Sequence, residues 1–288
     1  MSTEDCQTMV GQVKGVNDAT AQLFLAKGND LSYGSSSGMA VRYDNRQYLL
    51  TVAHMLPNAQ LERSGVVPVA VADVRNGKIG VISLGPCPVY CYLSAFRNIE
   101  TLALMEENDP GLDFTFFEIP EKYRIAKFNG SEGRPVRCYN PPFEQPHKGE
   151  ERYSFSAAIH VNCLSPAAGR VESLTYHHKE ITGLRVTDLQ NTYVRFDLDD
   201  KSQFAGVAMK SSSGAPILDQ RERPVALVVD GSEEDGYVVG VRLDRAWGVL
   251  TRTINGDLRP QDLSEEQYAK LIDSSIWDNI SNFSKTKD

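Results

Sequence analysis

Short runs in which apolar or β-branched residues recur between turn-forming residues dominate the chain. Such runs, bounded by Gly, Pro, Asn and Asp, are typical of strands in antiparallel sheets. The predicted strands are residues 21–26, 38–43, 47–53, 66–74, 153–161, 181–186, 192–198, 224–229 and 237–243. Because little helical periodicity separates them, the pattern favours an all-β sandwich or pair of barrels over an α/β sheet.

The strand pattern is interrupted in residues 128–151, where four prolines and three glycines occur without a regular period. This composition is typical of a connection between two folded parts. We therefore predict an N-terminal β half in residues 1–128, a connection in 129–150, a C-terminal β half in 151–257 and a tail in 258–288.

One amphipathic α-helix is predicted in the C-terminal tail. Ser264 is a candidate N-cap, and Gln267 at the third helical position completes a capping box. The apolar residues that follow at spacings of three and four are Tyr268, Leu271, Ile272, Ile276 and Ile280. We expect this stripe to pack against the second β half, the alternative being a role in binding a partner.

Composition and charge exclude several classes of protein. The net charge of −8 and the lack of a Lys/Arg cluster argue against nucleic-acid binding, which needs a positive face. No apolar run approaches the roughly 20 residues that span a bilayer, so we expect no membrane protein. The five cysteines are an odd and sparse set, and the first residues lack the pattern of a secretion signal. These features predict a reducing, cytoplasmic location.

No metal or other cofactor is predicted. Cys87 and Cys91 form a close pair, but no second pair or nearby histidine completes a four-ligand site. His177 and His178 stand beside charged residues and are expected in an exposed turn.

Three segments carry residue types suited to catalysis. His54 ends the predicted strand 47–53, and taken alone it is consistent with a histidine of the core. Asp113 opens an apolar strand, where it either caps a turn or receives hydrogen bonds from a fixed partner, because an unpaired buried carboxylate is costly. Ser213 lies among small residues in a segment that, taken alone, is an ordinary loop.

Together, these segments resemble the trypsin-like (chymotrypsin-fold) serine peptidases, most closely their bacterial and intracellular members. The strings that carry the resemblance are Thr51-Val52-Ala53-His54, Gly34-Ser35-Ser36-Ser37-Gly38, Asp113-Phe114-Thr115-Phe116 and Ser211-Ser212-Ser213-Gly214-Ala215-Pro216. The family order of His, Asp and Ser along the chain is kept, with 59 and 100 residues between them. The resemblance implies an all-β fold of two six-stranded antiparallel β-barrels, with His54 and Asp113 on the first and Ser213 on the second.

The resemblance also implies a role for each residue. Ser213 would be the nucleophile, His54 its general base, and Asp113 the acceptor that orients the imidazole. The backbone N–H groups of Ser211 and Ser213 would form the oxyanion hole. Ser211 departs from the family pattern, because a glycine usually stands there and tolerates the torsion that turns the N–H into the hole.

Substrate-binding segments follow from the same resemblance. The pocket walls would come from residues 205–208 and from Val229, Asp230 and Gly231, with the region of Gly236 at the base. Gly231 fits the position where the family pairs its backbone with an extended substrate. Asp230 would either attract a basic side chain or simply start the acidic turn 232–235, and the sequence leaves both interpretations open.

The sequence therefore predicts a cytoplasmic serine endopeptidase that hydrolyses a protein or peptide substrate, with neither nucleic acid nor membrane as a partner. Control by a regulatory protein partner, by narrow specificity or by a disordered active loop would prevent indiscriminate cleavage. One alternative is a catalytically silent or partner-activated binding or scaffold protein on the same fold, which Ser211 motivates. The other is an all-β interaction module whose motifs are accidental.

Overall fold

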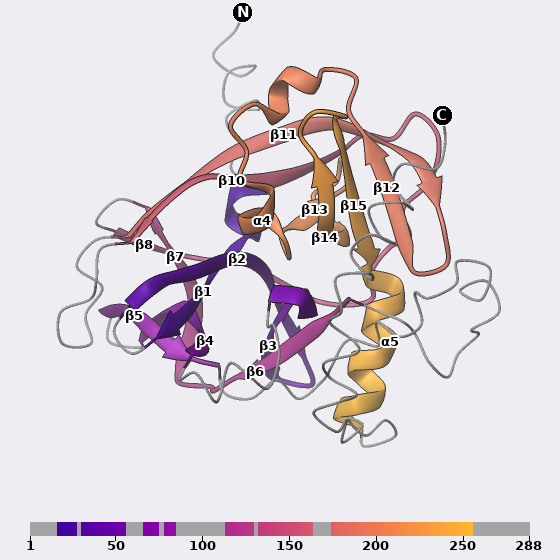
Figure 1. Cartoon of the computed structure of the whole chain (residues 1–288). Coiled ribbons are helices and arrows are strands. Elements are labelled where there is room, and N and C mark those ends of the chain that lie inside the picture. Colours follow the sequence, from indigo (N-terminus) through magenta and orange to yellow (C-terminus); the bar gives the residue numbers. More distant parts are fainter. Residues whose placement is uncertain are drawn as a thin grey trace, which may run out of the picture.

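The computed structural model describes residues 16–27, 30–55, 66–74, 78–84, 113–129, 132–163 and 174–255, which fold into two β halves packed against each other (Figure 1). The strands of the N-terminal half are β1 (Ala21–Lys27), β2 (Asp30–Tyr43), β3 (Arg46–Thr51), β4 (Val66–Val74), β5 (Lys78–Ser83), β6 (Thr115–Ile119), β7 (Tyr123–Asn129), β8 (Glu132–Pro135) and β9 (Cys138–Tyr139). They form a nine-stranded sheet in the order β6-β3-β2-β1-β4-β7-β8, with β5 beside β4 and β9 beside β2. The described part of this half thus holds more strands than the six expected.

The C-terminal half is a closed six-stranded barrel, as predicted. Its strands are β10 (Tyr153–Cys163), β11 (Leu174–Leu189), β12 (Tyr193–Asp197), β13 (Pro216–Leu218), β14 (Pro224–Ser232) and β15 (Tyr237–Arg242). They close in the order β10-β11-β12-β15-β14-β13, and every pairing is antiparallel. Between β12 and β13 the chain forms two short helical turns, η3 (Lys201–Phe204) and α4 (Met209–Ser212). Figure 1 shows α4 on the side of the barrel that faces β2.

All nine predicted strands are present, although β2 and β11 are longer than expected. The predicted hairpin between β2 and β3 is also confirmed. Its two loop residues, Asp44 and Asn45, have φ values of 47° and 59°, as the tight hairpin turn that suits strand twist requires. Strands β5, β7, β8 and β9 were not predicted. The last two lie within residues 129–150, and β8 (sequence EGRP) has low strand propensity and pairs with β7.

A C-terminal helix follows the barrel, but at a different place from the one expected. Helix α5 (Leu243–Ile254) begins directly after β15, in a range predicted to belong to the barrel. Its apolar side chains recur at helical spacing from Leu243 through Ala246 to Leu250, and these three are buried. The helix predicted from Ser264 lies outside the described residues. Of the helices that the structure describes, none has the length and apolarity to cross a membrane.

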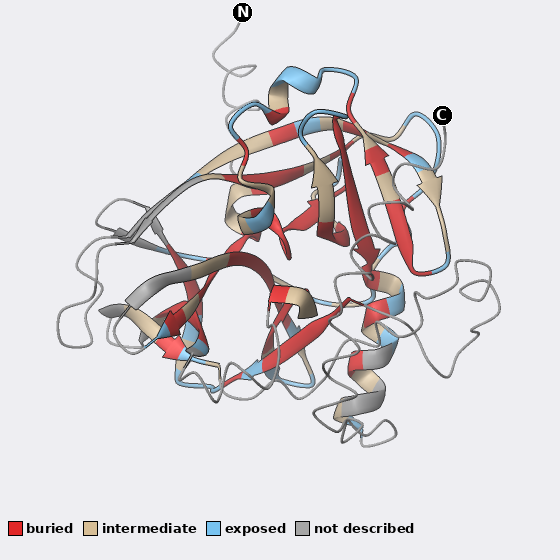
Figure 2. Cartoon of the chain, viewed as in Figure 1, coloured by how far each residue is buried: buried red, intermediate tan, exposed pale blue. Residues whose placement is uncertain are grey.

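The last strand of the barrel faces two cores at once. On β15, Tyr237, Val239 and Val241 belong to a core that extends into the N-terminal half, whereas Val238 belongs to the core of the barrel. Alternate side chains of a strand point to opposite faces, so one strand contributes to both. All six residues of β15 are buried (Figure 2). The two halves are therefore joined by an apolar interface.

A buried polar cluster ties the start of the chain to the second half. Ser156 Oγ donates to Asn17 Oδ1 at 2.7 Å and lies 2.9 Å from His178 Nδ1, and Lys127 Nζ donates to the Asn17 carbonyl. Because the Ser156 hydroxyl has one proton, His178 Nδ1 is the donor in the second bond. His178 lies within β11, so the predicted exposed turn is wrong. Burial, with a smaller contribution from the charge of Lys127, lowers the pKa of His178 to about 3.

We predict that His178 makes the fold sensitive to mild acid. The unfolded chain binds a proton on this residue near its ordinary pKa of about 6.5, whereas the folded chain does not bind it until about pH 3. Stability is therefore lost as the pH falls through this window, by about 2 kcal/mol between pH 7 and pH 5. Urea unfolding at both pH values measures the loss.

The His178→Asn variant keeps a donor toward Ser156 but cannot titrate, so it should lose about 2 kcal/mol less than the wild type over the same pH interval. His177, its exposed neighbour on the same strand, provides the matched control. His177→Asn should retain the wild-type difference, and an equal effect of both variants would contradict the assignment to His178.

Candidate active site

The register of two strands brings His54 and Asp113 together. Strands β3 and β6 pair antiparallel, with Thr51 opposite Thr115. His54 follows the end of β3 in the short helical turn η1 (Ala53–Met55), and Asp113 immediately precedes β6. Antiparallel pairing places the end of one strand beside the start of the other. Two residues separated by 59 positions in the sequence therefore meet at one edge of the sheet.

Both carboxylate oxygens of Asp113 accept hydrogen bonds from His54. Oδ1 accepts from the His54 backbone N–H at 2.9 Å, and Oδ2 lies 2.6 Å from His54 Nδ1. Asp113 is 0% exposed, and the side chain of His54 is 19% exposed. Because a carboxylate only accepts, Nδ1 carries a proton, and in the neutral imidazole the lone pair is on Nε2. Asp113 therefore has a fixed partner and is not a turn cap in solvent.

Ser213 is held through its main chain by β2. The Ser213 carbonyl accepts from the Ser37 N–H at 2.8 Å and from Ser36 Oγ at 2.6 Å. The Gly214 N–H donates to the Val228 carbonyl at 2.7 Å. Gly214 has φ of +86°, and a Cβ there would lie 2.1 Å from the Ser37 carbonyl oxygen. Only glycine fits this position, and it lets the serine backbone lie directly on β2.

Ser37 also links this segment to the strand that leads to His54. Its carbonyl oxygen accepts from Thr51 Oγ1 at 2.7 Å, and Thr51 is the last residue of β3. Thr51 Oγ1 would itself lie 2.4 Å from a Cβ on Gly214. The residue after Ser213 and the residue three positions before His54 are thus in direct contact. The serine-rich string of β2 connects the two halves at this point.

The segment predicted to supply the oxyanion hole forms the helical turn α4. The Ser211 N–H donates to the Ala208 carbonyl at 3.0 Å, and the Ser212 N–H donates to the same oxygen at 3.1 Å. Ser211 Oγ lies 2.7 Å from Ser35 Oγ, and the Ser211 carbonyl accepts from Ser37 Oγ at 2.9 Å. In this conformation the Ser211 N–H is therefore occupied and does not contribute to an oxyanion hole. The expected hole requires rotation of this peptide.

The predicted substrate-binding residues lie at the end of β14, beyond its pairing with β13. Strand β13 pairs with residues 224–227 of β14, and Val229, Asp230 and Gly231 continue past that point. A Cβ on Gly231 would lie 2.4 Å from Met209 Cε and 2.7 Å from the Tyr237 carbonyl oxygen, so only glycine fits. Asp230 belongs to β14 itself, opposite Val239. The turn after β14 is anchored by Glu233, which accepts from the Gly206 N–H at 2.8 Å.

A metal site does not emerge from the part of the chain that the structure describes, since no three His, Cys, Asp or Glu side chains group there. Sequence reasoning missed two contributors to the site. Tyr193 Oη accepts the Asp113 N–H at 2.9 Å, and Met209 covers Gly231. Both contacts join residues distant in sequence, and neither residue has a local pattern that announces its role.

Comparison with known proteins gives a likeness in fold. No family model and no curated protein sequence matches the chain. Among solved structures, Deg5 is similar with a TM-score of 0.48 and 11% identity over 89% of this chain and 98% of that chain. A serine endoprotease from Yersinia pestis has a TM-score of 0.43 and 13% identity over 85% of this chain and 66% of that chain. The scabies mite inactivated protease paralogue S-D1 has a TM-score of 0.50 and 11% identity over 85% and 95%.

Identities this low establish architecture and leave activity to be argued from the site. The closed six-stranded barrel, the second β sheet packed against it and the C-terminal helix agree with that architecture. The chain has the fold of the trypsin-like serine proteases.

Proposed function

We propose that the chain is a serine endopeptidase that uses His54, Asp113 and Ser213. The observation that carries this proposal is the buried, doubly hydrogen-bonded pair of Asp113 and His54, lying beside the segment that holds Ser213. A serine hydroxyl is a weak nucleophile near neutral pH and requires an adjacent base. An imidazole whose Nδ1 proton is fixed by a carboxylate offers Nε2 for that purpose.

The proposed reaction proceeds in two steps. Ser213 Oγ attacks the substrate carbonyl carbon while its proton passes to His54 Nε2, and Asp113 stabilises the resulting imidazolium. The C–N bond then breaks, the amine takes the proton from His54, and an ester remains on Ser213. Water attacks this ester by the same route, releasing the acid and restoring the hydroxyl.

An extended peptide is the substrate that the open end of β14 suits best. Gly214 bonds to Val228 across the β13–β14 pair, so Ser213 lies where β13 leaves β14. A strand added along residues 229–232 would bring one of its carbonyl groups to Ser213. Main-chain pairing of this kind accepts many sequences, and side-chain pockets would supply the preference.

A catalytically silent or partner-activated binding protein is the second candidate. The specific observation in its favour is the Ser211 N–H, which donates to Ala208 and not to a developing oxyanion. Oxyanion-hole donors contribute roughly 10²- to 10³-fold to turnover. A protein that keeps one donor occupied would be slow until substrate or a partner rotates the peptide.

We predict covalent labelling of Ser213 by a fluorophosphonate probe. The wild type should be labelled with the modification on Ser213, and Ser213→Ala should not be labelled, because the phosphonylated oxygen is gone. Ser202→Ala, which removes an exposed hydroxyl of η3 in the same half, should be labelled like the wild type. Failure of the folded wild type to react under any condition would favour the silent protein.

Asp113→Asn should preserve the fold and reduce turnover of a peptide substrate by about 10⁴-fold, the size typical of Ser-His-Asp enzymes. An asparagine amide can accept from only one of the two His54 donors, and its NH₂ group opposes the other. Steady-state kinetics with thermal unfolding as a folding control measures the effect. Turnover within tenfold of wild type would remove Asp113 from the mechanism.

Ser211→Gly should accelerate probe labelling by on the order of tenfold, because glycine adopts the backbone torsion that frees the N–H from Ala208. Ser35→Ala is the matched variant, since it removes the hydroxyl bound to Ser211 Oγ but keeps the Cβ at 211. Acceleration by both variants identifies the side-chain contact as the restraint, and acceleration by Ser211→Gly alone identifies the torsion. Unchanged rates in both would show that the turn does not limit the reaction.

A further inference from the structure

Tyr193 makes a polar contact between the two halves at the candidate site. It is the first residue of β12 in the barrel, and its Oη accepts the backbone N–H of Asp113 at 2.9 Å. Tyr193 is 4% exposed and Asp113 is 0% exposed, so the bond is shielded from water. The residue that orients His54 in one half is thereby tied to a strand of the other half.

This bond satisfies a donor that the sheet does not. The pairing of β3 with β6 ends at Thr51 and Thr115, two residues after Asp113. A buried backbone N–H without an acceptor costs about 1–3 kcal/mol. The phenol of Tyr193 supplies that acceptor from outside the sheet.

The carboxylate and the main chain of Asp113 are held by different partners. His54 binds both carboxylate oxygens, while Tyr193 binds the N–H of the same residue. Rotation of the Asp113 backbone would carry the carboxylate with it and lengthen the bond to Nδ1. Two anchors on opposite sides of Cα therefore fix the direction in which the carboxylate points.

Tyr193 is itself rigidly placed. The Tyr193 carbonyl accepts from the Gln190 N–H at 2.9 Å, closing the turn before β12. Arg242, which is 5% exposed, donates to the Gln190 carbonyl at 2.7 Å and forms a two-bonded pair with Asp244. A buried, bidentate guanidinium is a strong anchor. The position of the phenol is thus set by the barrel and the start of α5.

We propose that Tyr193 is a positioning residue for Asp113, which makes the alignment of the catalytic pair depend on the docking of the two halves. This inference rests on the proposed function for its effect on turnover. Tyr193 acts through Asp113 and is not assigned a contact with substrate or with the reacting atoms.

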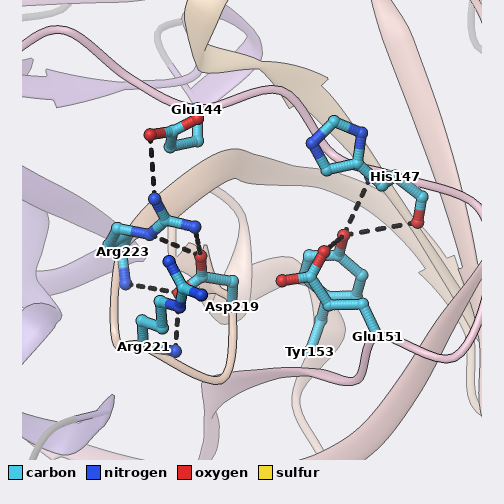
Figure 3. A network of polar contacts seen from close by, with 7 residues as sticks. All are labelled: Glu144, His147, Glu151, Tyr153, Asp219, Arg221 and Arg223. Carbon is cyan, nitrogen blue, oxygen red and sulfur yellow. Dashed lines mark hydrogen bonds and ion pairs between the residues drawn. The ribbon is translucent and has the colours of Figure 1, made fainter.

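The chain offers a matched control in Tyr153, at the start of β10. Its phenol also accepts a buried backbone N–H, that of His147 at 2.9 Å, and it donates to Glu151 Oε2 at 2.9 Å (Figure 3). Both tyrosines belong to the barrel and are nearly fully buried. Replacing either by phenylalanine removes one hydroxyl and keeps the ring, but only Tyr193 contacts the catalytic pair.

The experiment compares Tyr193→Phe and Tyr153→Phe with the wild type. In Tyr193→Phe, kcat for a peptide substrate should fall by about 10- to 100-fold with KM within about twofold, because misalignment affects the chemical step. In Tyr153→Phe both constants should stay within about twofold of wild type. Equal losses in the two variants, or an unchanged kcat in Tyr193→Phe, would overturn the proposal.

Proton NMR separates this inference from the proposed function. The His54 Nδ1 proton in its short bond to Asp113 should resonate downfield of the amide protons and vanish in His54→Ala. Tyr193→Phe should shift this signal upfield and accelerate its exchange with water, and Tyr153→Phe should not. An unchanged signal in Tyr193→Phe would refute the positioning role, whether or not the wild type cleaves peptides. Failure of probe labelling with the expected NMR change would refute only the proposed protease.

Discussion

Burial of the Asp113 carboxylate is the constraint on which the architecture of the site depends. A charge removed from water is stable only if hydrogen bonds replace its hydration. Here His54 contributes two donors, and Tyr193 accepts from the backbone of the same residue. The first two contacts require β3 and β6 in their observed register, and the third requires the barrel to dock against that sheet. Correct packing of both halves is therefore needed before this one side chain is satisfied.

The serine-rich segment of β2 meets a second requirement, which is to bring the barrel to the same place. Ser37 donates its N–H to Ser213 and accepts from Thr51 through its carbonyl, so one peptide unit contacts both halves. Small residues are needed on both sides of this contact, as the 2.1 Å approach to a Cβ at Gly214 demonstrates. The runs of serine and glycine in the sequence are thus explained by close backbone approach.

The sequence predicted what depends on local pattern and on recognisable strings. Alternation located nine strands, and the strings around His54, Asp113 and Ser213 indicated the candidate site. It failed where partners decide the outcome. Strand β8 exists because β7 lies beside it, and α5 begins at Leu243 within a run that also suits a strand. Tyr193 resembles any strand tyrosine, and only the packing of the two halves brings its hydroxyl to Asp113.

The turn at Ser211 bears on how fast the proposed enzyme reacts more than on whether it reacts. The contacts that hold this peptide are the N–H bond to Ala208 and the bonds to Ser35 and Ser37. Hydrogen bonds of this kind contribute about 0.5–1.5 kcal/mol each. One oxyanion-hole donor contributes about 3 kcal/mol in the transition state. The two quantities are of similar size, so a developing oxyanion offers most of the free energy needed to rotate the peptide. A substrate that also pairs with residues 229–232 would add to that driving force, which links strand addition at β14 to assembly of the hole.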